Sequence, residues 1–485
     1  MMRVFRKAAM AVVPLFVSGC VAITEDFDPK LGFAIVQDQT AATLGKETAW
    51  VQNRAEAAAV NKRVSQLLAN KTVGVETAVQ VALLNNKSLQ AAYADIGMSV
   101  ADLWQESLPV NPNLAVSYAG IGALRTVEGL IAANVIRLMT RERRLDVSEV
   151  RVLQARLRAV EATLALAAQT RAAWIEAVGA WETVAYMNRA KVAADAAAEL
   201  ATELGKTGAF PKIDQAREQV FYAELTGQTA EARLAAQLAK ERLIRLMGVW
   251  GGNLSFEVPN ALPSLPRNIQ TRNAIEAEAL RDRVDLQVAR LELDALARSY
   301  GLTKATRYVS DLELAAGLEL EEEAEEGEDG SKKSTNQLSG ILEVGLEIPI
   351  FDSGQARLRK AEFAYLRAAN VLAAKAVDIR SEARSAYKAY RSRYDIARHY
   401  RSNVVPLRTT IEKEAILTYS GMISNTFDLL ADTRAKLTSI ILSVNAKRAF
   451  YLADAGLASA VYGGGEIESG GGLEMAAGDG DGDGD

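Results

Sequence analysis

The sequence predicts a mainly α-helical protein made of two similar halves, each with long helices and one pair of strands. Alanine-rich, proline-free segments carry apolar residues at spacings of three and four, which is the helical period. Prolines and glycines cluster between these segments and divide the 485-residue chain into two halves. Short runs that alternate apolar and acidic residues lie between the helical segments and predict strands.

One long helix and two shorter ones are predicted in each half. The long helices cover residues 141–204 and 353–419, and Pro406 should kink or break the second. The shorter helices are predicted at 76–107, 212–248, 273–306 and 426–460. At about 1.5 Å per residue, the two shorter helices of each half together match the long one, at about 100 Å. This predicts a wall in which a continuous helix lies beside two helices placed end to end.

A strand pair is predicted between the first short helix and the long helix of each half. The clearest strands are 312–320 and 342–348, and the first half has weaker counterparts at 114–122 and 130–138. In the clear pair, leucines alternate with acids that would face a wet lumen if the leucines face lipid: Glu313, Glu319, Glu343 and Glu347. A half-buried soluble hairpin alternates in the same way.

Two further inferences concern these strands. Four strands cannot close a barrel in lipid, because open sheet edges would leave backbone groups unpaired, so several chains must contribute. Residues 321–337 form an acidic segment with glycine, serine and paired lysines. We expect it to be an exposed, mobile loop outside the cell.

The N-terminus predicts the location of the protein. A basic start is followed by an apolar stretch at 8–17, which is too short to span a membrane. The residues that end at Cys20 resemble a bacterial lipobox, which implies cleavage before Cys20 and its acylation, for example with palmitate. A lone cysteine in an apolar pocket is the alternative. Val21 stands where aspartate would favour retention in the inner membrane, so we expect a lipid-anchored outer membrane protein that extends into the periplasm.

Composition argues against several functions. The net charge is −5 from 56 basic and 61 acidic residues, which gives no field for recruiting nucleic acid. Cys20 is the only cysteine and His399, in a charged helical stretch, is the only histidine. We expect no catalytic site, no metal site and no cofactor. The tail from Gly463 ends in alternating glycine and aspartate and is expected to be disordered, with calcium binding as the alternative.

These observations give a predicted domain organisation. The boundaries are 1–19 for the signal peptide, 20–75 for an extended segment, 76–258 for the first repeat, 259–272 for a proline-rich connector, 273–462 for the second repeat and 463–485 for the tail.

Three segments carry a resemblance to a known family. They are residues 82–97 (ALLNNKSLQAAYADIG) with Asn111-Pro112 ahead of a strand, 345–354 (GLEIPIFDSG) and 419–434 (YSGMISNTFDLLADTR). Together they resemble the TolC-like outer membrane efflux proteins, in their lipoprotein subgroup. The resemblance implies a homotrimer with a twelve-stranded transmembrane β-barrel and a tunnel of helices, an α-barrel. It also implies a periplasmic adaptor and an inner membrane transporter as partners.

The resemblance further implies that the tunnel closes where the helical hairpins turn. One turn lies at 206–212 and the other at 420–425, and their candidate tip residues are Gly205, Gly208 and Gly421. Members of the family carry aspartates just after the second turn that narrow the closed aperture.

Asp428 and Asp432 match these aspartates and share one helix face because they are four residues apart. They are the candidate periplasmic gate. Alternatively they are ordinary exposed carboxylates, one of them paired with Arg434. The chain holds one more residue between Gly421 and Asp428 than the usual family spacing.

The function predicted from the sequence is a passive exit duct of a tripartite efflux pump or a type I secretion system. Three copies of the strand acids predict a preference for cations. The alternatives are a lipid-anchored periplasmic adaptor, which would have one hairpin between β-rich domains, and a lipoprotein enzyme with a helical scaffold.

Overall fold

The computed structural model describes residues 30, 32–69, 72–121, 124–208, 211–309, 311–326, 332–421 and 426–463. The chain forms two compact units, which are considered separately. Unit 1 comprises residues up to Ile35 with Tyr93–Leu157 and Gln287–Ala373, and unit 2 comprises Val36–Ala92, Arg158–Leu286 and Ala374–Asp485. Each unit therefore draws on both halves of the sequence.

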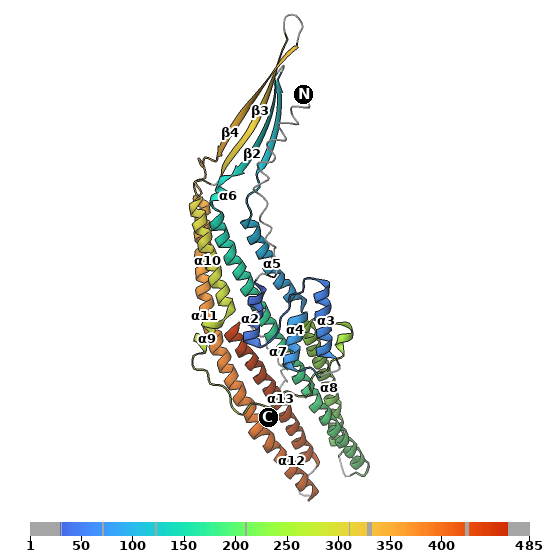
Figure 1. Cartoon of the computed structure of the whole chain (residues 1–485). Helices are drawn as coiled ribbons and strands as arrows, with labels where there is room; N and C mark the ends of the chain where they lie inside the picture. The colour runs from blue at the N-terminus through green and yellow to red at the C-terminus, as the bar shows by residue number, and fades with distance from the viewer. Residues whose placement is uncertain are drawn as a thin grey trace, which may run out of the picture. The chain divides into compact units, whose positions relative to one another are not determined.

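The chain consists of helices and two pairs of strands, and each pair lies between two groups of helices in the sequence. In chain order they are α2 (Phe33–Leu44), α3 (Arg54–Leu68), α4 (Val75–Asn85), α5 (Lys87–Ser107), β1 (Asn113–Ile121), β2 (Leu124–Asn134), α6 (Val135–Met139), α7 (Arg141–Lys206), α8 (Lys212–Met247), α9 (Ile275–Asp282), α10 (Val284–Ala305), β3 (Leu312–Glu326), β4 (Lys332–Leu346), α11 (Gln355–His399), α12 (Val405–Ser420) and α13 (Thr426–Tyr462). The prediction of a mainly helical chain with two strand pairs is confirmed (Figure 1).

The predicted helices agree with the structure except where the chain breaks without proline or glycine. Helices α7, α8 and α13 end within two residues of the predicted bounds. The predicted helix 353–419 contains a π-helical segment at Tyr400–Val404, between α11 and α12. Pro406 lies at the start of α12, so the wider π turn accommodates its missing N–H and its ring.

Each of the two helices predicted at 76–107 and 273–306 is instead broken once, into α4 and α5 and into α9 and α10. The break residues are Asn86, with φ −65° and ψ 124°, and Arg283, with φ −67° and ψ 120°. Each residue is a single extended step between two helices. The same break in each half supports the internal repeat.

Side-chain amides stabilise the break in the first half. The Nδ2 atom of Asn86 donates to the carbonyl of Leu246 at 2.9 Å, and that of Asn85 donates to the carbonyl of Gly248 at 2.6 Å. These carbonyls lie at the C-terminal end of α8, where helical carbonyls lack partners within the helix. The Oδ1 atom of Asn86 also accepts from the N–H of Leu89 at 3.1 Å and so caps α5.

An ion cluster stabilises the break in the second half. The Arg283 guanidinium donates to both carboxylate oxygens of Asp285, at 3.0 and 2.9 Å, and it also binds Glu382 on α11. Lys375 lies 3.3 Å from Asp285. Burial alone would raise the pKa of Asp285, but the hydrogen bonds and charge of Arg283, with Lys375, hold it below its usual value. Burial and the nearby charge of Asp285 raise the pKa of Glu161 on α7.

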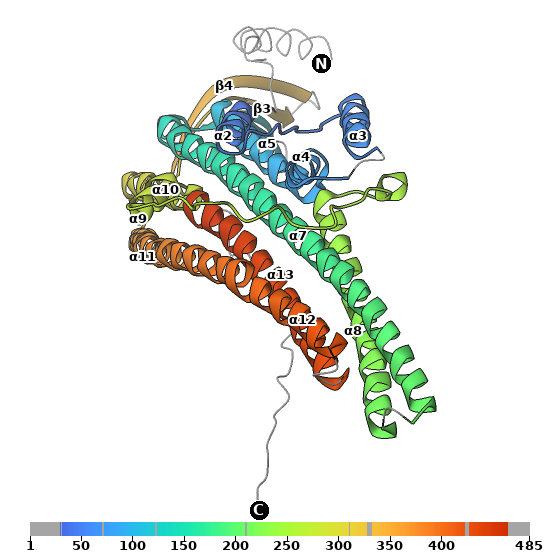
Figure 2. The same cartoon turned by 90° about the horizontal axis from the view of Figure 1, so that it is seen from below.

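Small side chains let the helices of unit 2 pack closely. Ala236 of α8 is fully buried beside Val184 and Met187 of α7 and Ile441 of α13. In Figure 2, α8 runs beside the latter part of α7, and α12 runs beside α13. These are the two hairpins that the sequence predicted, one in each half.

All four strands of unit 1 form one antiparallel sheet in the order β1-β2-β3-β4 (Figure 1). The strand predicted at 130–138 is wrong in position, because β2 covers Leu124–Asn134 and the chain then turns into the short helix α6. Residue Asn134 caps that helix by accepting from the N–H of Arg137 at 2.9 Å.

The prediction of a loop over 321–337 is also wrong. Residues 321–326 and 332–337 extend β3 and β4 in register, with Glu325 opposite Lys333 and Glu326 opposite Lys332. Only residues 327–331 of this segment lie outside the described part.

Candidate functional site

One face of the sheet is apolar and exposed. Four successive rows across the strands are made of apolar residues and glycine, and Tyr118, Val127, Leu320 and Leu338 make up one of them. Val116 on β1 is 71% exposed and Leu342 on β4 is 72% exposed. A protein in water rarely exposes so large a contiguous apolar face.

The length of this face suits a membrane. Leu312 and Leu320 are its limits on β3 and lie eight residues apart. That is about 26 Å along a strand, and a strand tilt of about 40° would reduce it to about 20 Å. The apolar band of an outer membrane barrel is about 25 Å tall. At the hairpin end the next row holds Arg125, Glu322 and Asn336, and the apolar face ends there.

The opposite face has one row made only of apolar residues and glycine, with Leu130 and Ile341, but it also contains a row of four polar residues and is called the polar face here. The register aligns Ser117, Glu128, Glu319 and Ser339 across all four strands. The Ser117 hydroxyl donates to Glu128 at 3.0 Å, and the Ser339 hydroxyl donates to Glu319 at 3.4 Å. Glu128 was not among the predicted acids, because the predicted strand began two residues after it.

The acids predicted to face a lumen follow this register. Glu313 and Glu319 of β3 and Glu343 of β4 all occupy the polar face. Glu347 is exposed and lies one residue beyond the end of β4, so it is not a strand residue. Strands β1 and β4 form the two edges of the sheet. The outward-facing backbone N–H and C=O groups of an edge strand can pair with a strand of another chain.

At the first helical turn, α7 ends at Lys206 and α8 begins at Lys212. Gly205 lies in the last turn of α7, where an added Cβ would come within 2.7 Å of the Gln215 side chain. Gly208 has φ +75°, a left-handed conformation that favours glycine. Gly205 therefore allows the close approach of Gln215, and Gly208 allows the left-handed backbone of the turn.

At the second turn, α12 ends at Ser420 and Gly421 follows with φ −80°. Gly421 is therefore not left-handed, and residues 422–425 lie outside the described part. Asp428 lies exposed in the first turn of α13, where a negative charge interacts favourably with the helix dipole. Asp432 follows one turn later and is half-buried.

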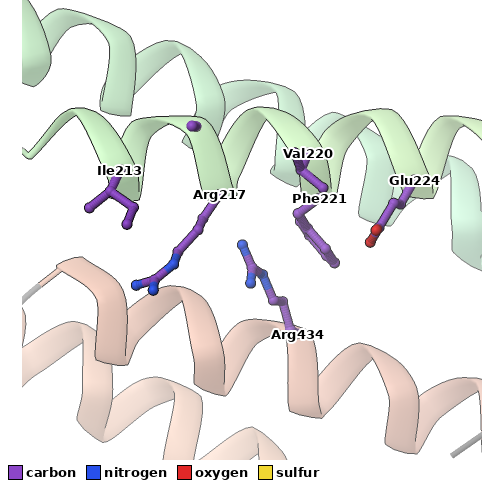
Figure 3. A pocket seen from close by; sticks show the side chains of 7 residues that line it. Ile213, Arg217, Val220, Phe221, Glu224 and Arg434 are labelled. Carbon is purple, nitrogen blue, oxygen red and sulfur yellow. The ribbon is translucent and has the colours of Figure 1, made fainter. Parts of the chain in front are cut away.

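Arg434, which the alternative interpretation paired with one of these aspartates, forms an ion pair with α8. Its guanidinium binds the buried Glu218 of α8 at 2.7 Å and lies over the Phe221 ring, 4.0 Å from the centroid. A cavity of about 490 Å³ adjoins this contact, with Arg217 and Val220 in its lining (Figure 3). The contact links the first-half hairpin to the second-half hairpin.

Several other expectations can be compared with the described residues. Cys20 and the tail from residue 464 lie outside them. No helix in the described part is long and apolar enough to cross a membrane. No group of three or more potential metal ligands occurs among the same residues. The Nδ1 atom of His399 is 3.1 Å from the Asn403 amide, and its contacts include no catalytic partner in the described part.

Comparison with known proteins gives one family match. Residues 277–461 match the family model described as outer membrane efflux protein. The second half of the chain is therefore similar to this family. Its matched segment covers most of the second predicted repeat, and a comparison with curated protein sequences gave no match.

Solved structures of outer membrane proteins share the fold of this chain. VceC from Vibrio cholerae is 17% identical, with a TM-score of 0.65 over 80% of this chain and 96% of that one. The CmeC outer membrane channel of Campylobacter jejuni is 17% identical, with a TM-score of 0.65 over 81% and 86%. The open MtrE outer membrane channel of Neisseria gonorrhoeae is 16% identical, with a TM-score of 0.63 over 80% and 89%.

The family also bears on the competing hypotheses. Its proteins are channels and not enzymes, so the hypothesis of a lipoprotein enzyme is not supported. The adaptor hypothesis required a single hairpin between β-rich domains. The described part of the chain instead has two hairpins and one four-stranded sheet, and the family match is to efflux channels. The adaptor hypothesis is therefore not supported either.

Proposed function

We propose that this chain is the outer membrane exit duct of a tripartite efflux pump or a type I secretion system. The observation that carries the proposal is the sheet, whose exposed apolar face suits lipid and whose opposite face holds acids and serines. A duct of this kind makes and breaks no covalent bond. The energy for transport comes from an inner membrane transporter, reached through a periplasmic adaptor.

The proposal includes a homotrimer. The sheet has two open edges, at β1 and β4, and backbone groups at a sheet edge cannot remain unpaired in lipid. Pairing β4 of one copy with β1 of the next removes every edge, and three copies give a barrel of twelve strands. Acylation of Cys20 would anchor the same chain in the outer membrane.

The gate is proposed at the second helical turn. Asp428 and Asp432 are four residues apart on α13, so their side chains share one face of the helix. In a trimer, three copies of this face would form two stacked acidic rings. Separation of the rings, as the tips of the hairpins move apart, would open the duct.

Single-channel conductance in planar bilayers tests the duct and the gate. The purified full chain is compared with the Asp428→Ala/Asp432→Ala variant, and Asp395→Ala on α11 is the control for loss of one helix carboxylate. We expect stepwise currents that grow in the double variant and not in the control. Absence of current from protein that is inserted in the bilayer would overturn the duct. Equal currents from all three chains would overturn the gate only.

Membrane extraction tests the two modes of attachment separately. The Cys20→Ala variant should resist extraction by high salt and alkali, because the sheet holds it in the membrane without acyl chains. Release of the variant into solution would show that the lipid was its only anchor, and that result would count against the barrel.

A further inference from the structure

Four exposed apolar side chains gather in unit 1 at the end of β3 and β4 that leads into the helices. They are called the collar here and consist of Tyr308, Ile348, Ile350 and Phe351. All four are more than half exposed, and Phe351 is fully exposed at 101%. Apolar side chains are normally buried away from water, so the exposure of four together indicates a binding partner.

The collar is held in place by backbone contacts. Arg307 Nε donates to the carbonyl of Ser353 at 3.1 Å, which joins the two segments that carry the collar. Gly354 has φ +70°, and an added Cβ there would lie 2.5 Å from the carbonyl oxygen of Arg307. The N–H of Ile350 donates to the carbonyl of Ile348 at 2.8 Å. The apolar side chains are therefore presented by an ordered structure.

The collar follows the apolar face of the sheet along the chain. On β4 that face is formed by alternate residues, among them Leu342, Val344 and Leu346. Ile348 follows at the same spacing of two beyond the end of the strand, and Ile350 follows a tight turn closed by its hydrogen bond to Ile348. Both are highly exposed, so the collar adjoins the apolar face of the sheet in the chain.

Basic side chains accompany the collar. The Arg307 guanidinium lies over the Tyr308 ring, 4.7 Å from its centroid. Exposed Lys304 precedes Arg307 by three residues, in the last turn of α10, and exposed Arg357 follows Gly354 by three residues, in the first turn of α11. All three cations are therefore within one helical turn of the contact between the two segments.

Two acids of the same segments accept hydrogen bonds within unit 1. Asp352 accepts from the N–H of Gly354 at 2.8 Å, and Asp311 accepts from the Asn134 amide. Exposed Glu347 adjoins Ile348, so the collar end carries cations beside acids. The hairpin end carries five glutamates over 321–326, with Lys332 and Lys333 at positions opposite two of them.

We propose that the collar and its cations bind the headgroups of anionic phospholipids, in the leaflet on the helical side of the sheet. The proposal rests on the proposed function, because it requires the sheet to be in a membrane. Aromatic rings favour the membrane interface, where one end meets hydrocarbon and the other meets water. Guanidinium and ammonium groups bind phosphate, and a cation near an anionic leaflet is attracted to it.

Insertion is tested with single tryptophan probes at three positions of unit 1. The full-length variants are Tyr118→Trp on the sheet face, Phe351→Trp in the collar and Val371→Trp, which is exposed on α11. Each is reconstituted into vesicles whose phospholipid chains carry bromine close to the headgroup, and the signal of the unsubstituted chain is subtracted. We expect bromine to quench the probes at 118 and 351 and to leave the probe at 371 unchanged.

The outcomes separate the two proposals. Quenching at 118 without quenching at 351 would overturn the collar and leave the proposed function intact. This is also the result expected if a second copy of the chain covers Phe351. Loss of quenching at both positions would overturn the proposed function, and the collar with it.

Variants that lack the cations of the collar test whether it prefers anionic phospholipids. The Lys304→Gln/Arg357→Gln variant is compared with Arg367→Gln, which removes an exposed cation further along α11. Retention of phosphatidylglycerol and of phosphatidylcholine on the purified protein is measured by native mass spectrometry. The double variant should retain less phosphatidylglycerol, by about fivefold for each cation removed, and the control should be unchanged. Equal retention by all chains, or equal losses of both lipids, would overturn the role of the cations.

Discussion

Arg434 on α13 and Glu218 on α8 form an ion pair of 2.7 Å that joins residues 216 positions apart in the sequence. Glu218 is 2% exposed, whereas the Arg434 side chain reaches solvent and also covers the Phe221 ring. The two partners therefore differ in what their loss would leave behind. Without Arg434, a buried carboxylate would have lost its cation, but without Glu218 the guanidinium could still be solvated.

This asymmetry gives the first prediction. Arg434→Gln should destabilise the packing of α8 on α13 by about 3 kcal/mol, because it leaves Glu218 buried without its charge partner. Glu218→Gln should cost less, about 1 kcal/mol, since its amide oxygen can still accept from Arg434. The measurement is amide hydrogen exchange in α8 and α13, which reports local opening.

The matched control is Arg217→Gln on α8, the helix that carries Glu218. Arg217 pairs at 2.9 Å with Asp214 in an exposed i,i+3 arrangement, which contributes little. Exchange rates in this variant should match the native protein. If Arg434→Gln and Arg217→Gln have the same small effect, the contact between Arg434 and Glu218 does not hold the hairpins together.

The second prediction concerns the helix break at Asn86. Asn86→Ala removes both the cap of α5 and the donor to the carbonyl of Leu246, so we expect a loss of about 1–2 kcal/mol in stability. Thermal unfolding measures this loss. Asn61→Ala, at an exposed position of α3, removes the same atoms without these contacts and should leave the unfolding temperature nearly unchanged. A similar shift in both variants would contradict the role assigned to the break.

The sequence was sufficient to predict the elements whose cause is local. α7 was predicted almost to the residue, because alanine, leucine and charged residues of high helix propensity continue without interruption. The breaks at Asn86 and Arg283 were missed because the contacts that stabilise them come from distant parts of the chain, at Leu246 and Glu382. Local propensity gives no sign of such contacts.

The sheet was predicted less accurately for a related reason. β2 has glycine and alanine within its pattern, so its alternation is weak, and its register follows from pairing with β3. For this reason Glu128 was missed although Glu319, directly opposite, was found. The partner of Arg434 was missed as well, since no local pattern connects it to Glu218.

The third prediction is a stability that depends on pH through Glu161. The pKa of Glu161 is raised in the folded state, so its ionised form disfavours folding at neutral pH. This cost is present above the raised pKa and disappears as the pH falls toward the usual value of about 4.3. Glu161→Gln should therefore raise the unfolding temperature at neutral pH and have little effect below about pH 4.

The pKa of Asp285, in the same cluster, is shifted in the opposite direction, so its effect on stability has the opposite dependence on pH. Its folded pKa is depressed, so it contributes stability above its usual value of about 3.9, and this is lost as the pH falls through the depressed pKa. Asp285→Asn should destabilise the protein at neutral pH, and the difference from the native chain should shrink in strong acid. An equal destabilisation at both pH values would show that packing, and not charge, explains the effect.

The fourth prediction concerns ion preference, and it depends on the proposed duct. Glu128 and Glu319 face each other in the register on the polar face of the sheet, so three copies would place six carboxylates in one ring around a lumen. A barrel of twelve strands spaced about 4.8 Å apart has a backbone radius of about 12 Å. That radius is close to the Debye length of about 10 Å at 0.1 M salt, so the ring should attract cations at this ionic strength or below.

Reversal potentials across a salt gradient measure this preference. The native chain should favour cations, and Glu128→Gln/Glu319→Gln should move the reversal potential toward zero. Glu322→Gln removes the same charge from a residue that alternates to the other face of β3, so its effect should be much smaller. Since screening weakens with dilution, the difference between the variants should grow as the salt concentration is lowered. A native chain that favours anions, or a larger effect of Glu322→Gln, would contradict the assignment of the polar face to the lumen.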